Sequence, residues 1–347
     1  MALEVSGRYE GVLATFLLKK AQNARIELRI DVDGKRPLNV VSADIYSNSG
    51  ITCKHLGSFV FRIAKRKIQN ENEIILVGES LKFDSKLGSL HQFRVRITLD
   101  SHPLMAEVSW ICSSSVEACL CEYKSRFFRR VNLQNDYEEG VTPFNSYNMN
   151  TLSATTQNGA SLLTVTGVYA ESGIELVVEK KAALIPHPKQ IFDRGSVWTD
   201  KALNEAMAKY FDVNRGQPGW SVWLLSAFEY EVPDFKGIMI ACEGHIRGCA
   251  IFHRAIGGGS DDEKRMLLYV YIHELGHCFN LQHPWVKTRG NYSAGNGRYS
   301  SLSWMNCPQR YYSSASSYGE AAFWKNFQFR FTDSELKNLR HGFWNNV

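Results

Sequence analysis

Three histidines and one glutamate between residues 273 and 283 have the types and the spacing of a metal-dependent hydrolytic site. His273 and His277 are four residues apart, so on a helix they lie on the same face. Two imidazoles at this spacing can bind one zinc ion, and Glu274 beside them can accept and deliver a proton. His283 follows six residues after His277 and can supply a third ligand once the chain has turned back.

The residues around these side chains predict the helix that must position them. Ser260 and Glu263 form an S-x-x-E capping box directly after three consecutive glycines, which places the helix start at residue 260. Residues 266–272 are apolar on every side, so we expect a buried helix. Asn280 stands where the chain must leave the helix and turn toward His283, and Asn tolerates the left-handed conformation that such a turn needs.

The histidine segment and a later turn together resemble a known family. Residues 273–283 read H-E-x-x-H-x-x-N-x-x-H, and Met305 follows 22 residues after His283 within the segment 301–308, S-L-S-W-M-N-C-P. This combination resembles the metzincin zinc peptidases, which share H-E-x-x-H-x-x-G-x-x-H and a downstream Met-turn. Pro284, directly after the third histidine, is similar to the serralysins, although the family within the clan stays open.

Two positions depart from the family pattern. Asn280 stands where the family carries Gly, and Cys307 stands where serralysins and astacins carry a Tyr near the zinc. The first departure is compatible with the left-handed turn. The second leaves open whether Cys307 or one of the nearby residues Tyr311 and Tyr312 takes the place of that Tyr.

The resemblance implies a zinc-dependent endopeptidase that acts on a protein or peptide substrate. One catalytic Zn²⁺ would be held by His273, His277 and His283, and Glu274 would be the general base for a zinc-activated water. Met305 would form an apolar floor beneath the histidines. The alternative is a catalytically inactive metzincin scaffold whose N-terminal β-domain binds a protein or glycan partner. A third interpretation is a zinc hydrolase that acts on a non-peptide amide.

The pattern of the chain predicts two domains. Residues 1–135 contain several short segments that alternate polar and apolar residues, such as 25–32 and 93–99, which indicates an antiparallel β-sandwich-like domain of unknown role. Residues 136–161 are rich in Asn, Ser, Thr and Gly and are the candidate linker. Residues 162–347 are expected to form a metzincin-type α/β catalytic domain with a long active-site helix and a C-terminal helix.

Within the catalytic half, sequence signals predict individual elements. Thr199 can cap a helix over residues 200–211, and Thr332 with Glu335 forms a second capping box for a helix that runs to about Trp344. By its position before the active-site helix, the strand 249–252 is either an edge strand that binds an extended peptide or an ordinary core strand. His341 on the last helix is expected to be structural, and so are the isolated histidines at positions 187, 245 and 253.

Composition and charge bear on the class of protein and on its possible partners. Hydrophobic residues make up 44% and charged residues 22% of the 347 residues, as in an ordinary globular protein, and the net charge of +5 is too small to argue for nucleic acid. No signal peptide or membrane span is recognisable, so we expect a cytoplasmic protein or export by a non-classical route. Cys242 and Cys249 can pair if oxidised. The oligomeric state is not determined by the sequence.

Overall fold

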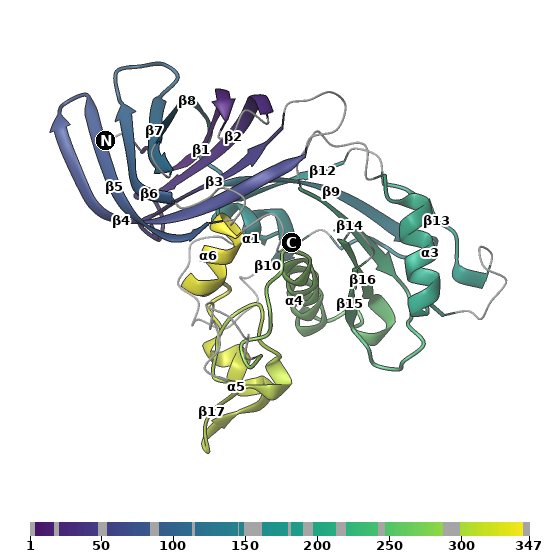
Figure 1. The fold of residues 1–347 in the computed structure, drawn as a ribbon. Helices are drawn as coiled ribbons and strands as arrows, with labels where there is room; N and C mark the ends of the chain where they lie inside the picture. The colour runs from purple at the N-terminus through teal and green to yellow at the C-terminus, as the bar shows by residue number, and fades with distance from the viewer. Residues whose placement is uncertain are drawn as a thin grey trace. The chain divides into compact units, whose positions relative to one another are not determined.

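The computed structural model describes most of the chain, shown in Figure 1, namely residues 4–16, 21–47, 54–83, 90–112, 115–144, 146–148, 162–179, 182–189, 197–212, 220–241, 247–286 and 299–342. By its internal contacts the chain divides into two compact units. The first unit contains residues 1–129 together with 340–346, and the second contains residues 130–339. Each unit has a hydrophobic core of its own.

The first unit is a closed barrel of eight antiparallel strands. Consecutive strands pair with one another, and β8 returns to pair with β1. The strands are β1 (Gly7–Phe16), β2 (Ala21–Asp31), β3 (Val40–Tyr46), β4 (His55–Asn70), β5 (Glu73–Phe83), β6 (Leu90–Thr98), β7 (Met105–Cys112) and β8 (Ser115–Ser125).

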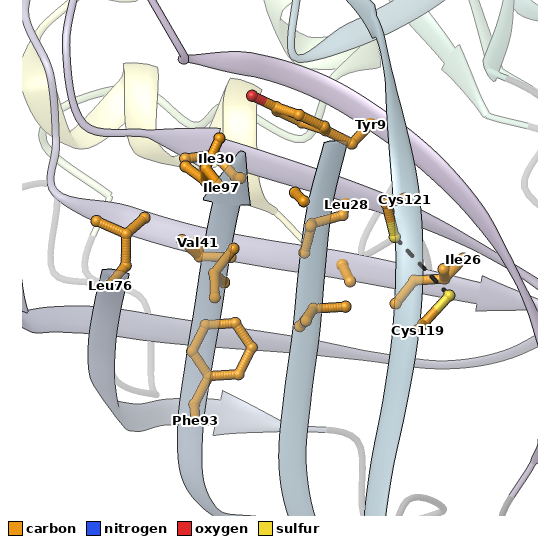
Figure 2. Packing of buried hydrophobic residues seen from close by; sticks show 14 of the residues in the cluster. Tyr9, Ile26, Leu28, Ile30, Val41, Leu76, Phe93, Ile97, Cys119 and Cys121 are labelled. Atoms are coloured by element: carbon orange, nitrogen blue, oxygen red, sulfur yellow. Dashed lines mark hydrogen bonds between the residues drawn. The ribbon is translucent and has the colours of Figure 1, made fainter. Parts of the chain in front are cut away.

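The interior of the barrel is built by the alternation that the sequence shows. On β2, Ile26, Leu28 and Ile30 are fully buried in the core, while the residues between them lie on the other face of the strand. Figure 2 shows these three side chains gathered with residues from strands far apart in the sequence, including Phe93 and Cys121. An apolar interior of this kind stabilises the barrel mainly by removing hydrocarbon surface from water.

The predicted β-sandwich is wrong, because the sheet closes on itself. Gly11 on β1 pairs with Cys121 on β8, and this pairing joins the two ends of the sheet. A Cβ at Gly11 would lie 2.5 Å from the Leu120 carbonyl oxygen, so glycine permits the close approach. Alternating strands look the same in a sandwich and in a barrel, and the difference lies only in which distant edges pair.

The outer face of β2 and β3 carries a buried network of charges. Asp44 accepts hydrogen bonds from Arg29, from Ser58 Oγ at 2.5 Å and from Arg129 Nη1 at 3.2 Å. Further along the same face, Asp31 Oδ2 lies 3.0 Å from Arg340 Nη1 and 3.2 Å from His341 Nε2. All of these side chains except the hydroxyl of Ser58 are ionised or ionisable, and each is almost completely buried.

The second unit is built on a six-stranded mixed sheet. The main path runs β12–β9–β14–β16–β15, and β13 pairs with β9 outside this path. Strands β9, β14 and β16 are parallel to one another, whereas β15 is antiparallel to β16. The bounds are β9 (Arg129–Glu138), β12 (Ile174–Val178), β13 (Leu184–Ile185), β14 (Trp220–Ala227), β15 (Gly237–Ala241) and β16 (Arg247–Phe252).

The longest helix of the second unit, α4, runs from Asp261 to Cys278 and contacts β15 and β16. Eleven of its residues are buried, which agrees with the apolar stretch in the sequence. The other helices among the described residues are α1 (Val165–Glu171), α3 (Asp200–Tyr210), α5 (Gly319–Asn326) and α6 (Asp333–His341). The described residues also contain two 3-10 turns, η6 (His253–Ala255) and η7 (Pro308–Arg310). Short strand pairs are formed by β10 (Tyr147–Asn148) with β11 (Leu162–Leu163) and by β17 (Tyr312–Ser314) with β18 (Ser317–Tyr318).

Two further expectations require correction. The chain is strand-rich, with 45% strand and 23% helix, and its fold does not indicate the metzincin-type α/β domain with a long active-site helix. An H-E-x-x-H spacing needs only one turn of helix and does not determine the sheet around it. Of the two alternatives for strand 249–252, the edge strand is wrong and the core strand is confirmed, because β16 lies between β14 and β15, and β15 is at the edge of the described sheet.

The structure locates the remaining predicted elements as follows. Helix α3 begins after Thr199, whose hydroxyl accepts the Ala202 N–H at 3.1 Å, as its capping residue should. Helix α6 ends at His341, and position 344, to which the sequence extends this helix, lies outside the described residues. Residues 149–161 of the candidate linker and Cys242 of the candidate disulfide also lie outside the described residues, whereas Cys249 is a buried free thiol.

Candidate metal centre

Helix α4 begins at the position that the sequence predicts. Ser260 is its N-cap, and its hydroxyl accepts the Glu263 N–H at 3.2 Å. The Glu263 carboxylate in turn accepts the Ser260 N–H at 2.9 Å, which completes the capping box and confirms the prediction. This start places His273 and His277 one turn apart near the other end of the helix.

The three histidines converge on one point. His273 Nε2 lies 3.1 Å from both His277 Nε2 and His283 Nε2, and the last two atoms are 3.2 Å apart. Nitrogen ligands of one tetrahedral zinc ion are about 3.3 Å apart, given Zn–N bonds of about 2.0–2.1 Å. Among the described residues, these histidines form the one group of three or more side chains that could hold a metal ion.

The hydrogen bonds of the Nδ1 atoms show which ring nitrogen of His273 and of His277 carries the proton. His273 Nδ1 lies 2.7 Å from the Trp304 carbonyl oxygen, and His277 Nδ1 lies 2.8 Å from the Leu281 carbonyl oxygen. A carbonyl oxygen can only accept a hydrogen bond, so each Nδ1 carries the proton. In the neutral imidazoles the two Nε2 atoms therefore direct lone pairs toward the same point. Lone pairs that face one another repel, and a cation bound between them would accept both. The residues therefore fit a metal ion.

Electrostatics favour the neutral, metal-binding form of all three imidazoles. Burial lowers the pKa of His273 well below its usual value, and the nearby His277 and His283 lower it further. Burial lowers the pKa of His277 as well. For His283, burial together with His277 and Arg310 lowers the pKa to about 4. Unprotonated imidazole nitrogen is the form that coordinates metal ions.

The turn from α4 to His283 has the predicted left-handed residue. Asn280 has a φ of 64°, and it follows the helix C-cap Phe279. The N–H of Leu281 donates to the Gly276 carbonyl at 3.0 Å, which closes the end of the helix and brings the Leu281 carbonyl back to His277. The turn therefore places a ligand and also orients another. The ring of His283 then stacks on Trp285 with centroids 4.5 Å apart.

Glu274 lies on α4 directly after the first histidine and is almost completely buried. Burial raises the pKa of its carboxyl group to about 8. No described residue donates a hydrogen bond to this carboxylate or forms an ion pair with it. The edge strand β15 passes beside it, because a Cβ at Gly237 would lie 2.7 Å from Glu274 Cγ. A bound divalent cation would supply the positive charge that Glu274 lacks.

Met305 packs against helix α4 at Gly276. It is fully buried, and a Cβ at Gly276 of α4 would collide with the Met305 sulfur. We call residues 303–306 the Met305 turn. Asn306 fixes this turn, since its side-chain amide donates to the Tyr299 carbonyl at 3.0 Å and its amide oxygen accepts the Cys307 N–H at 2.9 Å. The Trp304 carbonyl that binds His273 belongs to the same turn.

Cys307 and the nearby Tyr311 and Tyr312, which the sequence left as alternatives for the family tyrosine, contact residues other than the three histidines. Cys307 is half-buried and its Sγ lies 3.2 Å from Gln309 Oε1. Tyr311 is buried against Phe323, and Tyr312 is exposed. None of the described contacts of these three residues reaches the histidines.

Several residues that support the site were not predicted from the sequence. The carbonyl groups of Trp304 and Leu281 carry no sequence signal, because every residue has one. Asn306 stands in the Met305 turn, and that position could have suggested a link to the site. The histidines expected to be structural have other partners where they are described: His253 Nε2 lies 2.9 Å from the Tyr271 hydroxyl, and His187 lies 3.5 Å from Glu138.

Comparison of the chain with protein families, with characterised proteins and with solved structures found no match. None of the helices among the described residues combines the length and the apolar character needed to cross a membrane. The candidate site is therefore defined by its own geometry, a cluster of His273, His277 and His283 that could hold a metal ion. Glu274, the residue after His273 on the same helix, contributes a buried carboxyl group.

Proposed function

We propose that this chain is a zinc-dependent endopeptidase in which Glu274 is the general base. The observation that carries the proposal is the convergence of three Nε2 atoms within 3.2 Å of one another. It is joined by a buried glutamate, the residue directly after the first histidine, which has no cationic partner among the described residues. Histidine ligands and a carboxylate in this arrangement are typical of zinc hydrolases.

The ligand set favours zinc in a catalytic site over a structural one. Three neutral imidazoles suit zinc, and a structural zinc site has four protein ligands, whereas a catalytic site keeps a position for water or substrate. Among the described residues there is no fourth ligand in this group. When bound, zinc would supply a Lewis acid that polarises the scissile carbonyl group and makes water more acidic.

Glu274 provides the proton transfer. In its ionised form the carboxylate would accept a proton from the attacking water and then deliver it to the amine that leaves. Its burial against β15 limits the competing water around it and strengthens its electrostatic interaction with a nearby cation. His273 and His277, with Nδ1 protons held by backbone carbonyls, keep their orientation while these transfers occur.

The edge strand β15 supports a peptide as the substrate. One side of β15 pairs with β16, and its first residue, Gly237, packs against Glu274. An extended peptide could add to the free side of this strand by backbone hydrogen bonds.

The test compares the zinc-loaded wild type with Glu274→Gln on an unfolded protein, with the fragments identified by mass spectrometry. We expect the variant to retain zinc and to lose turnover by about 10²–10⁴-fold, which is the usual contribution of a general base. Glu205→Gln is the matched control, because Glu205 is a partly exposed residue of α3 and undergoes the same chemical change.

Two results would contradict the proposal. Wild-type turnover in Glu274→Gln would show that Glu274 is not the general base. A zinc-loaded wild type that cleaves no peptide would show that the chain is not a peptidase. In the second case the alternative of a catalytically inactive scaffold, with an N-terminal β-domain that binds a protein or glycan partner, becomes the better hypothesis. Cleavage of a small non-peptide amide by the same zinc-loaded wild type would instead favour the third interpretation.

A further inference from the structure

The Met305 turn is a direct neighbour of the metal centre, because the Trp304 carbonyl accepts the Nδ1 proton of His273 at 2.7 Å. The direction of this carbonyl sets the direction of the imidazole ring and hence of its Nε2 lone pair. Whatever holds the turn in place also holds the first ligand. The residues that do so lie on both sides of the turn and include one from a distant helix.

Ser303 joins the turn to helix α6. Its Oγ accepts the Met305 N–H at 3.1 Å and donates to Glu335 Oε2 at 2.5 Å. Ser303 is fully buried, and Glu335 is 4% exposed. The same Glu335 oxygen accepts the Thr332 N–H at 2.7 Å. A continuous chain of hydrogen bonds therefore leads from the start of α6 through a buried carboxylate and a hydroxyl to the turn that orients His273.

The two capping boxes of this unit show that Glu335 does more than cap a helix. Glu263 accepts the N–H groups of Gly259 and Ser260, both of them backbone groups, and it lies on an exposed helix start. Glu335 has the same position in its own capping box, but it is buried and accepts a side-chain hydroxyl from a segment 32 residues earlier. Helix capping alone does not require burial of the carboxylate, which is costly without strong partners.

We infer that Glu335 is a positioning residue for the metal centre, acting through Ser303 and the Met305 turn on His273. The inference rests on the proposed function, since it assigns a supporting role in the same site. It concerns metal binding and can be tested without any substrate. Residues that support metal ligands in this way typically change metal affinity by about 10–100-fold when they are altered.

The experiment measures zinc affinity by competition with a chromogenic chelator for four variants of the full chain. Ser303→Ala removes the link while the α6 capping box stays intact. Glu335→Ala removes both the link and the cap. Thr332→Ala is the matched control, because it removes the hydroxyl that accepts the Glu335 N–H at 3.3 Å and leaves the Ser303–Glu335 hydrogen bond in place. Glu335→Gln is the conservative variant, because its amide oxygen can still accept both hydrogen bonds.

We expect zinc affinity to fall about tenfold in Ser303→Ala and in Glu335→Ala, to remain within about twofold of wild type in Thr332→Ala, and to recover largely in Glu335→Gln. The absorption bands of the cobalt-substituted chain should shift in the first two variants, because they report the ligand geometry directly. Circular dichroism of each variant verifies that it is folded before the titration.

Equal zinc affinities and unchanged cobalt spectra in Ser303→Ala, Glu335→Ala and Thr332→Ala would overturn the inference and reduce Glu335 to a capping residue. A wild type that binds no zinc would overturn it together with the proposed function. If the variants differ as expected but the zinc-loaded wild type cleaves no peptide, only the peptidase proposal fails. The two failures are thus distinguishable.

Discussion

Two buried polar clusters among the described residues, one in each unit, differ in how their carboxyl groups are paired. On the barrel, Asp44 is paired with Arg29 and Arg129, and Asp31 is paired with Arg340 and His341. In the metal centre, the Nε2 atoms of three imidazoles lie within 3.2 Å of one another, and Glu274 has no cationic partner among the described residues. Each buried carboxylate of the barrel cluster has cationic partners, whereas the carboxylate of Glu274 has none among the described residues.

The pKa values of the two buried carboxyl groups express this difference. Burial alone would raise the pKa of Asp44, but Arg29 and Arg129 lower it to about 2. Burial raises the pKa of Glu274 to about 8, and no neighbouring cation opposes it. A buried polar group with all its partners serves the structure, whereas a buried group without them is a candidate for binding or catalysis.

The barrel cluster also shows why residue types alone are a poor guide to function. Ser42 Oγ lies 2.9 Å from His341 Nδ1, and His341 Nε2 lies 3.2 Å from Asp31, which is the composition of a hydrolytic triad. The His341 and Asp31 side chains are both completely buried, and Ser42 is 1% exposed. No substrate can reach a nucleophile in that position. The arrangement therefore supports the structure of the first unit.

The largest expected effect comes from removing a ligand. His277→Ala should weaken zinc binding by more than about a hundredfold, because loss of a direct ligand exceeds the effect of altering a supporting residue. Metal content after dialysis checks this prediction. His187→Ala is the control, since His187 lies outside the cluster near Glu138 and should leave zinc binding unchanged. Equal zinc content in wild type and His277→Ala would show that the histidine cluster does not bind zinc.

A substitution in the barrel cluster should lower the stability of the fold and leave zinc affinity unchanged. Asp44→Asn leaves Arg29 and Arg129 without their shared carboxylate, and breaking a buried ion pair costs about 3–5 kcal/mol in the free energy of unfolding. Urea unfolding measures the loss, and a zinc titration at low urea should match wild type. A variant with wild-type stability would show that the ion pairs of Asp44 with Arg29 and Arg129 do not stabilise the barrel.

Acid should destabilise the first unit through His341. Burial lowers the pKa of His341 to about 4, with Asp31 opposing and with Arg29 and Arg340 adding to the decrease, while the unfolded value is about 6.5. The folded form therefore resists a proton that the unfolded form accepts, so stability is present above pH 6.5 and is lost as the pH falls toward 4. The loss is of the order of 3 kcal/mol.

The measurement is the urea midpoint of wild type and His341→Gln at pH 7 and pH 4.5. The amide of Gln can hydrogen-bond to both Ser42 and Asp31 but does not titrate, so the variant should lose less stability on acidification. Histidines of the metal centre titrate equally in both proteins and cancel in the comparison. An identical pH dependence in the two proteins would exclude His341 as the cause.

The smallest effect is expected at the turn into the metal centre. Asn280 has a φ of 64°, a conformation that Gly adopts without strain, so Asn280→Gly should change the free energy of unfolding by less than about 0.5 kcal/mol and leave zinc affinity unchanged. Asn280→Val is the contrasting variant, because a β-branched residue is strained there. Thermal unfolding with and without zinc measures both. A large loss of zinc affinity in Asn280→Gly would contradict the role of the turn.

Much of the candidate site was readable from local sequence. The spacing of His273 and His277, the capping box at Ser260 and the left-handed Asn280 each depend on residues within a few positions of one another, and helix geometry converts such spacing into direction. The β-structure of the first unit was readable from alternation for the same reason. Local rules of this kind predicted what each segment forms.

The tertiary structure alone decided how the segments combine. The closure of β8 onto β1, the place of β15 at the sheet edge and the link from Glu335 to Ser303 all join residues far apart in the chain. Such pairings follow from which surfaces can be buried together, and periodicity does not record them. By itself the sequence determined the three histidines that could hold a metal ion and the helix that carries two of them. The long-range contacts determined which carbonyls orient those ligands and which buried charges remain without a partner.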